Sequence, residues 1–490
     1  MNRSTSSRLA VGLVVALASF SGVAGAEDLD RLEQRAQDLI RQLETELDAV
    51  RAERARVERE RKALEAERAT LEAEKKGVAP GAPAAAAAGP EPAPTETSRK
   101  VDILTEEVEQ LKENLNLPPT RELKSKYGLG PAASKVYDVK RGLSLGGYGE
   151  GFFSFKTQEG ESRADALRFV LYTGYKFTDR ILLNTELEFE HATTSSTASS
   201  SGGSVSLEFG YLDFLGWDWL NARAGLVLVP MGFLNELHEP TTFFGNNRPE
   251  LERRVIPTTW RELGTGVFGN VFHPDLSYRA YVITSLDAEG FTSEGVRGGR
   301  QQGNRALAED IAGTARLDYM PHQVPGLLLG ASAFGGDTGQ NQEFAGERID
   351  VPVTLYEVHG QYRGYGLELR GIGAWGDIGD AATLSRALDQ TIASEIEGWY
   401  LEAGYDVMPW ILPDYPNQYA APFVRYSEVD TQARVPAGFV ADLAQNQDIF
   451  TVGLSYKPIP QVVLKLDYRA FWVEEGERPD EINVGLGFIF

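Results

Sequence analysis

The sequence predicts an all-β transmembrane barrel of about 16 antiparallel strands, preceded by a periplasmic α-helical coiled-coil region. Two observations predict the barrel. In the last ten residues, Ile482, Val484 and Leu486 fall on one face of a strand and Asn483 and Gly485 on the other, which suits a strand between lipid and water. The connections before this strand alternate between short turns and long polar segments. That alternation is the layout of a bacterial outer-membrane barrel.

Residues 1–26 predict a secretory signal peptide. Two arginines precede the apolar run 9–20, and the small residues Ala24-Gly-Ala26 follow it as a cleavage site. The apolar run is shorter than the roughly 20 residues of a transmembrane helix. Because the sequence contains no cysteine, we expect an exported protein without disulfides or thiolate metal sites.

Segment 27–76 is rich in Glu, Arg and Ala and contains no Pro or Gly, and its apolar residues recur every seven positions, which predicts a coiled coil. A single solvated helix held by Glu–Arg pairs is the alternative. A Pro/Ala linker at 77–97 leads to a second, short heptad segment at 98–117, which favours an oligomer because so short a helix needs partners. The first segment repeats apolar residues every seven positions, at Leu29, Ala36, Leu43, Val50, Val57, Leu64 and Leu71.

Residues 118–140 are predicted as a connector and residues 141–490 as the barrel, where apolar side chains alternate with polar ones. After the turn at Thr178-Asp179, for example, Leu187 opposes Glu186 and Glu188. Counting strands between the connections gives about 16, a size that leaves an aqueous channel. The mean hydropathy of -0.28 agrees with a barrel, because only alternate residues face lipid.

Charge on the strands is expected to line water, because Arg or Lys at the middle of a bilayer costs about 2–4 kcal/mol. Facing rows of opposite charge would then orient dipolar solutes in the lumen. For any single residue, a solvated position without a role is the alternative. Arg297 and Arg300, by contrast, are expected at an exposed external tip. The predicted lumen-lining residues are Arg168, Glu186, Glu188, Arg223, Arg316, Arg370, Arg425 and Arg469.

The connection 232–260 differs from the other long connections, because it carries aromatic residues such as Phe243, Phe244 and Trp260 instead of small polar ones. We therefore expect it to pack against something. It is the third external loop by count, and it predicts a pore constriction; packing at a trimer contact is the alternative. The predicted constriction residues are Glu236, His238, Glu239, Arg248, Glu250, Glu252, Arg253, Arg254 and Arg261.

Several stretches of the barrel region carry a family resemblance. The run KYGLGPAASKVY at 126–137, GLSLGGYGE at 142–150, EPTTFFGNNRPE at 239–250 and IPTTWRELG at 256–264 resemble bacterial porins grouped around the phosphate-selective porin O/P family. A coiled coil ahead of the barrel is similar to the DcaP-like porins. The resemblance implies a trimeric diffusion channel of about 16 strands. It does not extend to phosphate selectivity, because the dense Arg/Lys ladder of that family is replaced here by a lumen of mixed sign.

These features predict a porin of the bacterial outer membrane for passive diffusion of small hydrophilic, charged solutes, with its N-terminal region in the periplasm. The expected partners are outer-membrane lipid, a homotrimer of the chain and, through the coiled coil, peptidoglycan. A structural barrel that tethers the membrane to the cell wall is the alternative. The net charge of -23 argues against nucleic acid.

An enzyme is the third class of function considered, and the sequence argues against it. No nucleophile or metal-ligand spacing surrounds any histidine, so we expect no catalytic residue, no cofactor and no metal. The histidines are His191, His238, His273, His322 and His359.

Overall fold

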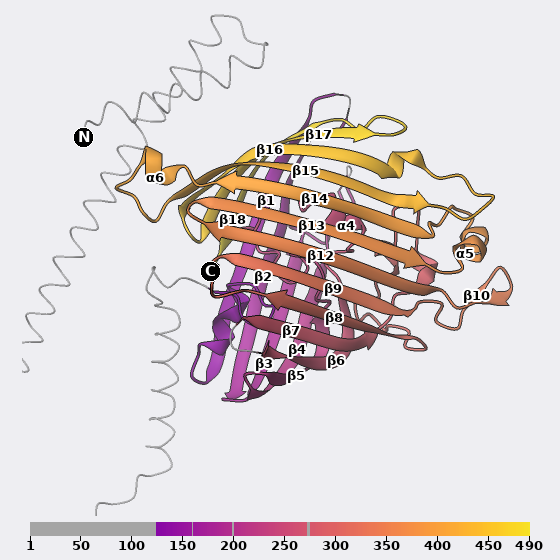
Figure 1. The fold of residues 1–490 in the computed structure, drawn as a ribbon, viewed down its shortest axis with the longest axis horizontal. Helices are drawn as coiled ribbons and strands as arrows, with labels where there is room; N and C mark the ends of the chain where they lie inside the picture. The colour runs from indigo at the N-terminus through magenta and orange to yellow at the C-terminus, as the bar shows by residue number, and fades with distance from the viewer. Residues whose placement is uncertain (1–123, 159, 198–199, 272–274) are drawn as a thin grey trace, which may run out of the picture. The chain divides into compact units, whose positions relative to one another are not determined.

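The computed structural model describes residues 124–158, 160–197, 200–271 and 275–490. Within these residues, 16 antiparallel strands form a closed barrel (Figure 1). Strands that follow one another in the barrel are paired in sequence order, and β1 (Gly142–Lys156) pairs with β18 (Glu481–Ile489) to close the ring. The prediction of an all-β barrel of about 16 strands is therefore confirmed.

The remaining elements follow the same plan. The other barrel strands are β2 (Arg163–Thr178), β3 (Ile181–Glu190), β4 (Val205–Trp217), β5 (Leu220–Leu228), β6 (Arg261–Val271), β7 (Leu276–Thr284), β8 (Ile311–Tyr319), β9 (Leu327–Asp337), β12 (Pro352–Gly364), β13 (Leu367–Ile378), β14 (Glu395–Tyr405), β15 (Tyr419–Arg434), β16 (Asn446–Ile459) and β17 (Val462–Val473). A separate hairpin consists of β10 (Glu343–Phe344) and β11 (Glu347–Arg348). The helices of the described residues are short: η1 (Ala133–Tyr137), α4 (Glu250–Arg254), η2 (Ala288–Gly290), η3 (Arg297–Gly299), α5 (Ala381–Leu388), α6 (Met408–Ile411) and η4 (Leu443–Gln445).

The alternating pattern of the sequence determines which face of each strand turns inward. In β3, Glu186 and Glu188 are buried, whereas Leu187 and Phe189 are both 38% exposed. The same alternation leaves an apolar outer surface, which includes Phe153, Leu171, Val282, Trp375, Leu401 and Leu466. An apolar exterior around a charged interior is what a barrel in a membrane requires. The predicted transmembrane barrel is confirmed in this respect.

The seam between β1 and β18 depends on two glycines. The Gly147 N–H donates to the Phe490 carbonyl at 3.0 Å, and the Phe490 N–H donates back at 2.9 Å. A Cβ at Gly147 would lie 2.7 Å from Cζ of Phe490, and one at Gly149 would lie 2.6 Å from Cζ of Phe488. The aromatic rings at the end of β18 therefore occupy the space that side chains on β1 would need.

Long and short connections alternate around the barrel, as predicted. Turns such as 179–180 and 365–366 join strands at one end, and loops such as 191–204 and 285–310 join them at the other. The third long connection runs from β5 to β6 and contains α4. This is the connection that the sequence singled out.

The predicted signal peptide, both coiled-coil segments, the linker and the first residues of the connector lie outside the described residues. Among the residues that the structure describes, no helix is long and apolar enough to cross a membrane.

Candidate functional site

The lumen loop, residues 232–260, lies inside the barrel and reaches its wall on several sides. The Arg370 guanidinium of β13 donates to the Thr242 carbonyl at 3.0 Å, and Lys465 Nζ of β17 donates to the Gly245 carbonyl at 2.8 Å. The same loop also touches β3 and β4, which lie across the ring from β13. The loop therefore crosses the lumen, with helix α4 drawn within the wall of strands in Figure 1.

Helix α4 is anchored to the wall by its first residue. Glu250 accepts hydrogen bonds from Arg469 at 3.0 Å and from Arg478 at 3.2 Å, and it pairs with Arg253 at 2.9 Å. Burial favours the neutral carboxyl, but the guanidinium groups of Arg253, Arg469 and Arg478 outweigh it and lower the pKa of Glu250 below its ordinary value. The carboxylate is therefore charged at neutral pH and joins the loop to β17.

Glu252 joins α4 both to the start of the lumen loop and to β14. Its Oε2 accepts the Leu234 N–H at 2.6 Å, and its Oε1 accepts the Tyr400 hydroxyl at 2.7 Å. Glu252 and Tyr400 are each 0% exposed, so both donors depend on this one carboxyl for a partner.

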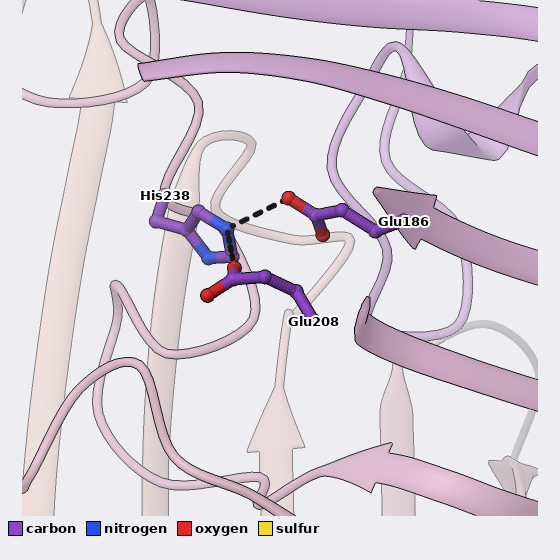
Figure 2. Close-up of side chains that lie close together, drawn as sticks. All are labelled: Glu186, Glu208 and His238. Carbon is purple, nitrogen blue, oxygen red and sulfur yellow. Dashed lines mark hydrogen bonds and ion pairs between the residues drawn. The ribbon is translucent and has the colours of Figure 1, made fainter. Parts of the chain in front are cut away.

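His238, Glu186 and Glu208 meet where the lumen loop touches β3 and β4 (Figure 2). Nε2 of His238 lies 3.4 Å from Glu186 Oε1 and 3.2 Å from Glu208 Oε2, and all three residues are buried. Burial alone would lower the pKa of His238, but the two carboxylates raise it to about 9. The sequence did not suggest this cluster, because its members come from two strands and a loop.

The predicted lumen-lining arginines all turn inward, where their charges are paired. In the sheet register, Arg223 lies opposite Asp213 and Arg425 lies opposite Glu402, and the side chains of each pair are 2.7 Å apart. The expectation of two facing rows of opposite charge is therefore wrong, because neighbouring strands place acid and base side by side. The remaining contacts are Arg168 to Glu150 (2.8 Å) and Glu188 (3.6 Å), Arg316 to Asp318 (2.9 Å), Arg370 to Glu402 (3.8 Å), and Arg469 to Glu481 (3.0 Å).

Most predicted constriction residues lie buried in contact with the wall or with the connector. Arg253 is the exception, with 46% of its side chain exposed. Arg248 donates to Thr259 at 2.9 Å, while its Nε and Nη2 have no hydrogen-bond partner among the described residues. The other contacts are Glu236 to Arg279 (2.8 Å), Glu239 to the Ala132 N–H (2.9 Å), Arg254 to Thr431 (3.2 Å) and Arg261 to Glu208 (3.1 Å).

The expectation of an exposed tip at Arg297 and Arg300 is wrong. Arg297 Nη1 donates to the Arg253 carbonyl at 3.1 Å, and Arg300 Nη1 donates to the Pro257 carbonyl at 3.0 Å. The two guanidinium groups thus hold the backbone of the lumen loop.

The connector also enters the lumen, whereas the sequence predicts it only as a link between the helical region and the barrel. Leu129 is 1% exposed and Val136 is 0% exposed. The Tyr137 hydroxyl, on η1, is 3.3 Å from Nη2 of Arg223, which extends from the wall strand β5. The apolar residues of the connector are the sequence feature that indicates its burial, since a solvated connector does not need them.

A cavity of about 860 Å³ lies at the end of the barrel that carries the short turns. Its lining includes Pro131 of the connector, Thr242 and Phe244 of the lumen loop, and Arg363 and Lys457 of the wall. The lumen loop and the connector therefore form part of the boundary between this cavity and the rest of the interior.

The chain is similar to known proteins in sequence and in structure. No family model matches the sequence. A protein of Aquifex aeolicus (strain VF5), described as an uncharacterized protein, is 37% identical over 356 residues, which are 70% of this chain and 78% of that protein. Among solved structures, the chain is similar to Salmonella typhi OmpF in complex with Daunomycin, with a TM-score of 0.46, 14% identity and coverage of 72% of this chain and 98% of that one. It is also similar to OmpTdeltaL8, a loop L8 deletion mutant of the Vibrio cholerae outer membrane protein OmpT, with a TM-score of 0.45, 10% identity and coverage of 72% and 100%.

Proposed function

The chain belongs to the same family as the Aquifex aeolicus protein, and from its geometry we propose that it is an outer-membrane porin, a water-filled channel for passive diffusion of small hydrophilic, charged solutes. One observation carries the proposal: the closed barrel is apolar outside and charged inside, and its third long loop crosses the lumen. A barrel of about 16 strands has room for such a channel.

The lumen loop is the proposed constriction. Glu250 and Glu252 fix it to β17 and β14, so the loop stays in place during permeation. Its exposed charge is positive, because the Arg253 side chain is 46% exposed, whereas Glu250 is buried and shared by Arg253, Arg469 of β17 and Arg478 of the β17–β18 connection. Between low-dielectric walls such a charge acts strongly on a passing ion.

Single-channel recording in planar bilayers tests the proposal on the full chain. We expect discrete conductance steps, and a zero-current potential in a salt gradient that changes when charge on the lumen loop is changed. Steps that are absent at every voltage and salt concentration would contradict a channel.

A structural barrel is the second candidate, and the crowded lumen favours it, because the connector and the lumen loop both occupy the interior. A variant in which residues 240–249 are replaced by a short Gly-Ser link separates the two candidates. Conductance in neither the full chain nor this variant would favour the structural barrel. Conductance only in the variant would show that the lumen loop closes the interior of the full chain, which likewise contradicts an open channel.

The assembly is likewise proposed from the sequence. The heptad segments at 27–76 and 98–117 support a homotrimer with a periplasmic N-terminal region that contacts peptidoglycan, as does the resemblance to the phosphate-selective porin O/P group and the DcaP-like porins. Mass measurement in detergent and co-sedimentation with purified peptidoglycan test these two points. A monomeric mass would contradict the homotrimer, and a protein that stays in the supernatant would contradict binding to peptidoglycan.

A further inference from the structure

We propose that Glu186, Glu208 and His238 bind one divalent transition-metal cation, which fastens the lumen loop to β3 and β4. The three side chains each offer one ligand atom, and these atoms lie within 4.8 Å of one another (Figure 2). The site does not depend on channel activity, since a porin or a structural barrel could equally contain it.

The orientation of the imidazole is the first support. Nδ1 of His238 lies 3.2 Å from the Asn235 carbonyl, which can only accept, so Nδ1 carries the hydrogen. Nε2 is left to face both carboxylates. A histidine that binds a metal usually donates one ring N–H to a carboxylate, a backbone carbonyl or water and turns its other nitrogen to the metal. The hydrogen bond of Nδ1 to the Asn235 carbonyl thus leaves Nε2 free to be that ligand.

Unpaired oxygens are the second and independent support. Among the described residues, Glu186 Oε2 has no hydrogen-bond partner, and Glu208 Oε2 has only its ion-pair contact with His238 Nε2 at 3.2 Å, although Glu186 is 0% and Glu208 2% exposed. A single hydrogen on Nε2 cannot make good hydrogen bonds to both carboxylates, which lie 3.4 and 3.2 Å away. A cation bound by the two carboxylates would satisfy oxygens that protein groups leave without a hydrogen bond.

His359 is a second buried histidine of the barrel that contacts two carboxylates, and its contacts differ from those of His238. Its Nδ1 lies 2.9 Å from Glu357 Oε2, and its Nε2 lies 3.0 Å from Asp318 Oδ1. Arg316 also donates to that aspartate. At His359 each ring nitrogen therefore faces one carboxylate, so protein groups supply partners for the imidazole and for both carboxylates. At His238 the carboxylates converge on one nitrogen instead.

Groups behind the ligands hold them in place. Arg261 donates to Glu208 Oε1 at 3.1 Å, and the Tyr148 hydroxyl donates to Glu186 Oε1 at 3.4 Å. Such contacts fix the direction of a metal-binding carboxylate. One imidazole with two carboxylates suits Mn²⁺, Fe²⁺ or Zn²⁺ better than the oxygen-only preference of Ca²⁺ or Mg²⁺.

Calorimetric titration of the EDTA-treated full chain with ZnCl₂ and with MnCl₂ tests the site. We expect one equivalent per chain, a rise in unfolding temperature with the metal, and slower hydrogen exchange across residues 232–260. His238→Gln and Glu208→Gln should each raise Kd at least ~10-fold. The matched control His359→Gln should retain wild-type affinity, even if it lowers stability.

Two outcomes would overturn the proposal. One is a wild-type chain that binds neither cation. The other is equal affinity in the wild type and in His238→Gln, which would place the metal at surface groups such as His322. If the variants do not fold, X-ray absorption of the zinc-loaded wild type decides: one imidazole with carboxylate oxygens at about 2.0–2.2 Å supports the site, and more than one imidazole refutes it.

Discussion

Replacing Glu252 with leucine should release the lumen loop from β14. The leucine leaves the Leu234 N–H and the Tyr400 O–H without an acceptor in a site that is 0% exposed. A buried donor without a partner costs about 1–3 kcal/mol, so the two together cost roughly 2–6 kcal/mol of loop docking. Even the lower value raises the detached population of the loop about 30-fold. Glu252→Gln keeps one acceptor oxygen and should cause less than half of this loss.

Hydrogen exchange measured by mass spectrometry reports the detached population of the lumen loop. Peptides from residues 232–260 should exchange at least ~10-fold faster in Glu252→Leu, while peptides from the strands exchange as in the wild type. Glu397→Leu, at an exposed position of β14, is the matched control and should leave the loop unchanged. A folded Glu252→Leu barrel whose loop exchanges at the wild-type rate would refute the reasoning, because the carboxyl would then contribute nothing to docking.

Three further substitutions test other parts of the lumen. Arg253→Gln should move the zero-current potential in a KCl gradient toward cation preference, whereas Arg305→Gln, on an exposed loop, should not; equal shifts would place Arg253 away from the ion path. Deleting residues 124–139 should raise single-channel conductance, because the connector occupies the lumen, and an unchanged value would show that ions pass elsewhere. Trp260→Ala, at a position 0% exposed, should lower the free energy of unfolding by about 3–5 kcal/mol in a denaturant titration. Trp410→Ala, 77% exposed, should lower it by less than about 0.5 kcal/mol, and similar losses would contradict the packing argument.

The barrel was predictable because apolar and polar residues alternate along most of its strands. Leu187 and Glu188 face lipid and lumen as their spacing requires, and the composition of 232–260 indicated that this loop packs. The partners within the lumen were not predictable. Side chains such as Glu186 and His238 lie on segments that are distant in the sequence and meet only in the folded barrel. No local sequence pattern indicates that they are in contact.

Two expectations fail for the same physical reason. The sequence around Arg297 and Arg300 is polar, which is typical of an exposed tip, but these side chains bind carbonyls of another loop. The connector lies between the predicted coiled coil and the barrel, but its apolar residues Leu129 and Val136 are buried. In both cases the burial comes from contacts between distant segments, which sequence periodicity does not report.

The β1–β18 seam also orders the events of assembly. Phe155 pairs with Ile482 across the whole length of the barrel sequence, so the ring cannot close until its final strand is in place, and such non-local pairing is slow. Until then the first and last strands present unpaired edges, and the anchors of the lumen loop on β3 and β17 are not held in one ring. The full set of anchors for the loop is therefore complete only after closure. Resistance of residues 232–260 to an added protease would mark a finished barrel, and cleavage there would mark one stalled on its way into the membrane.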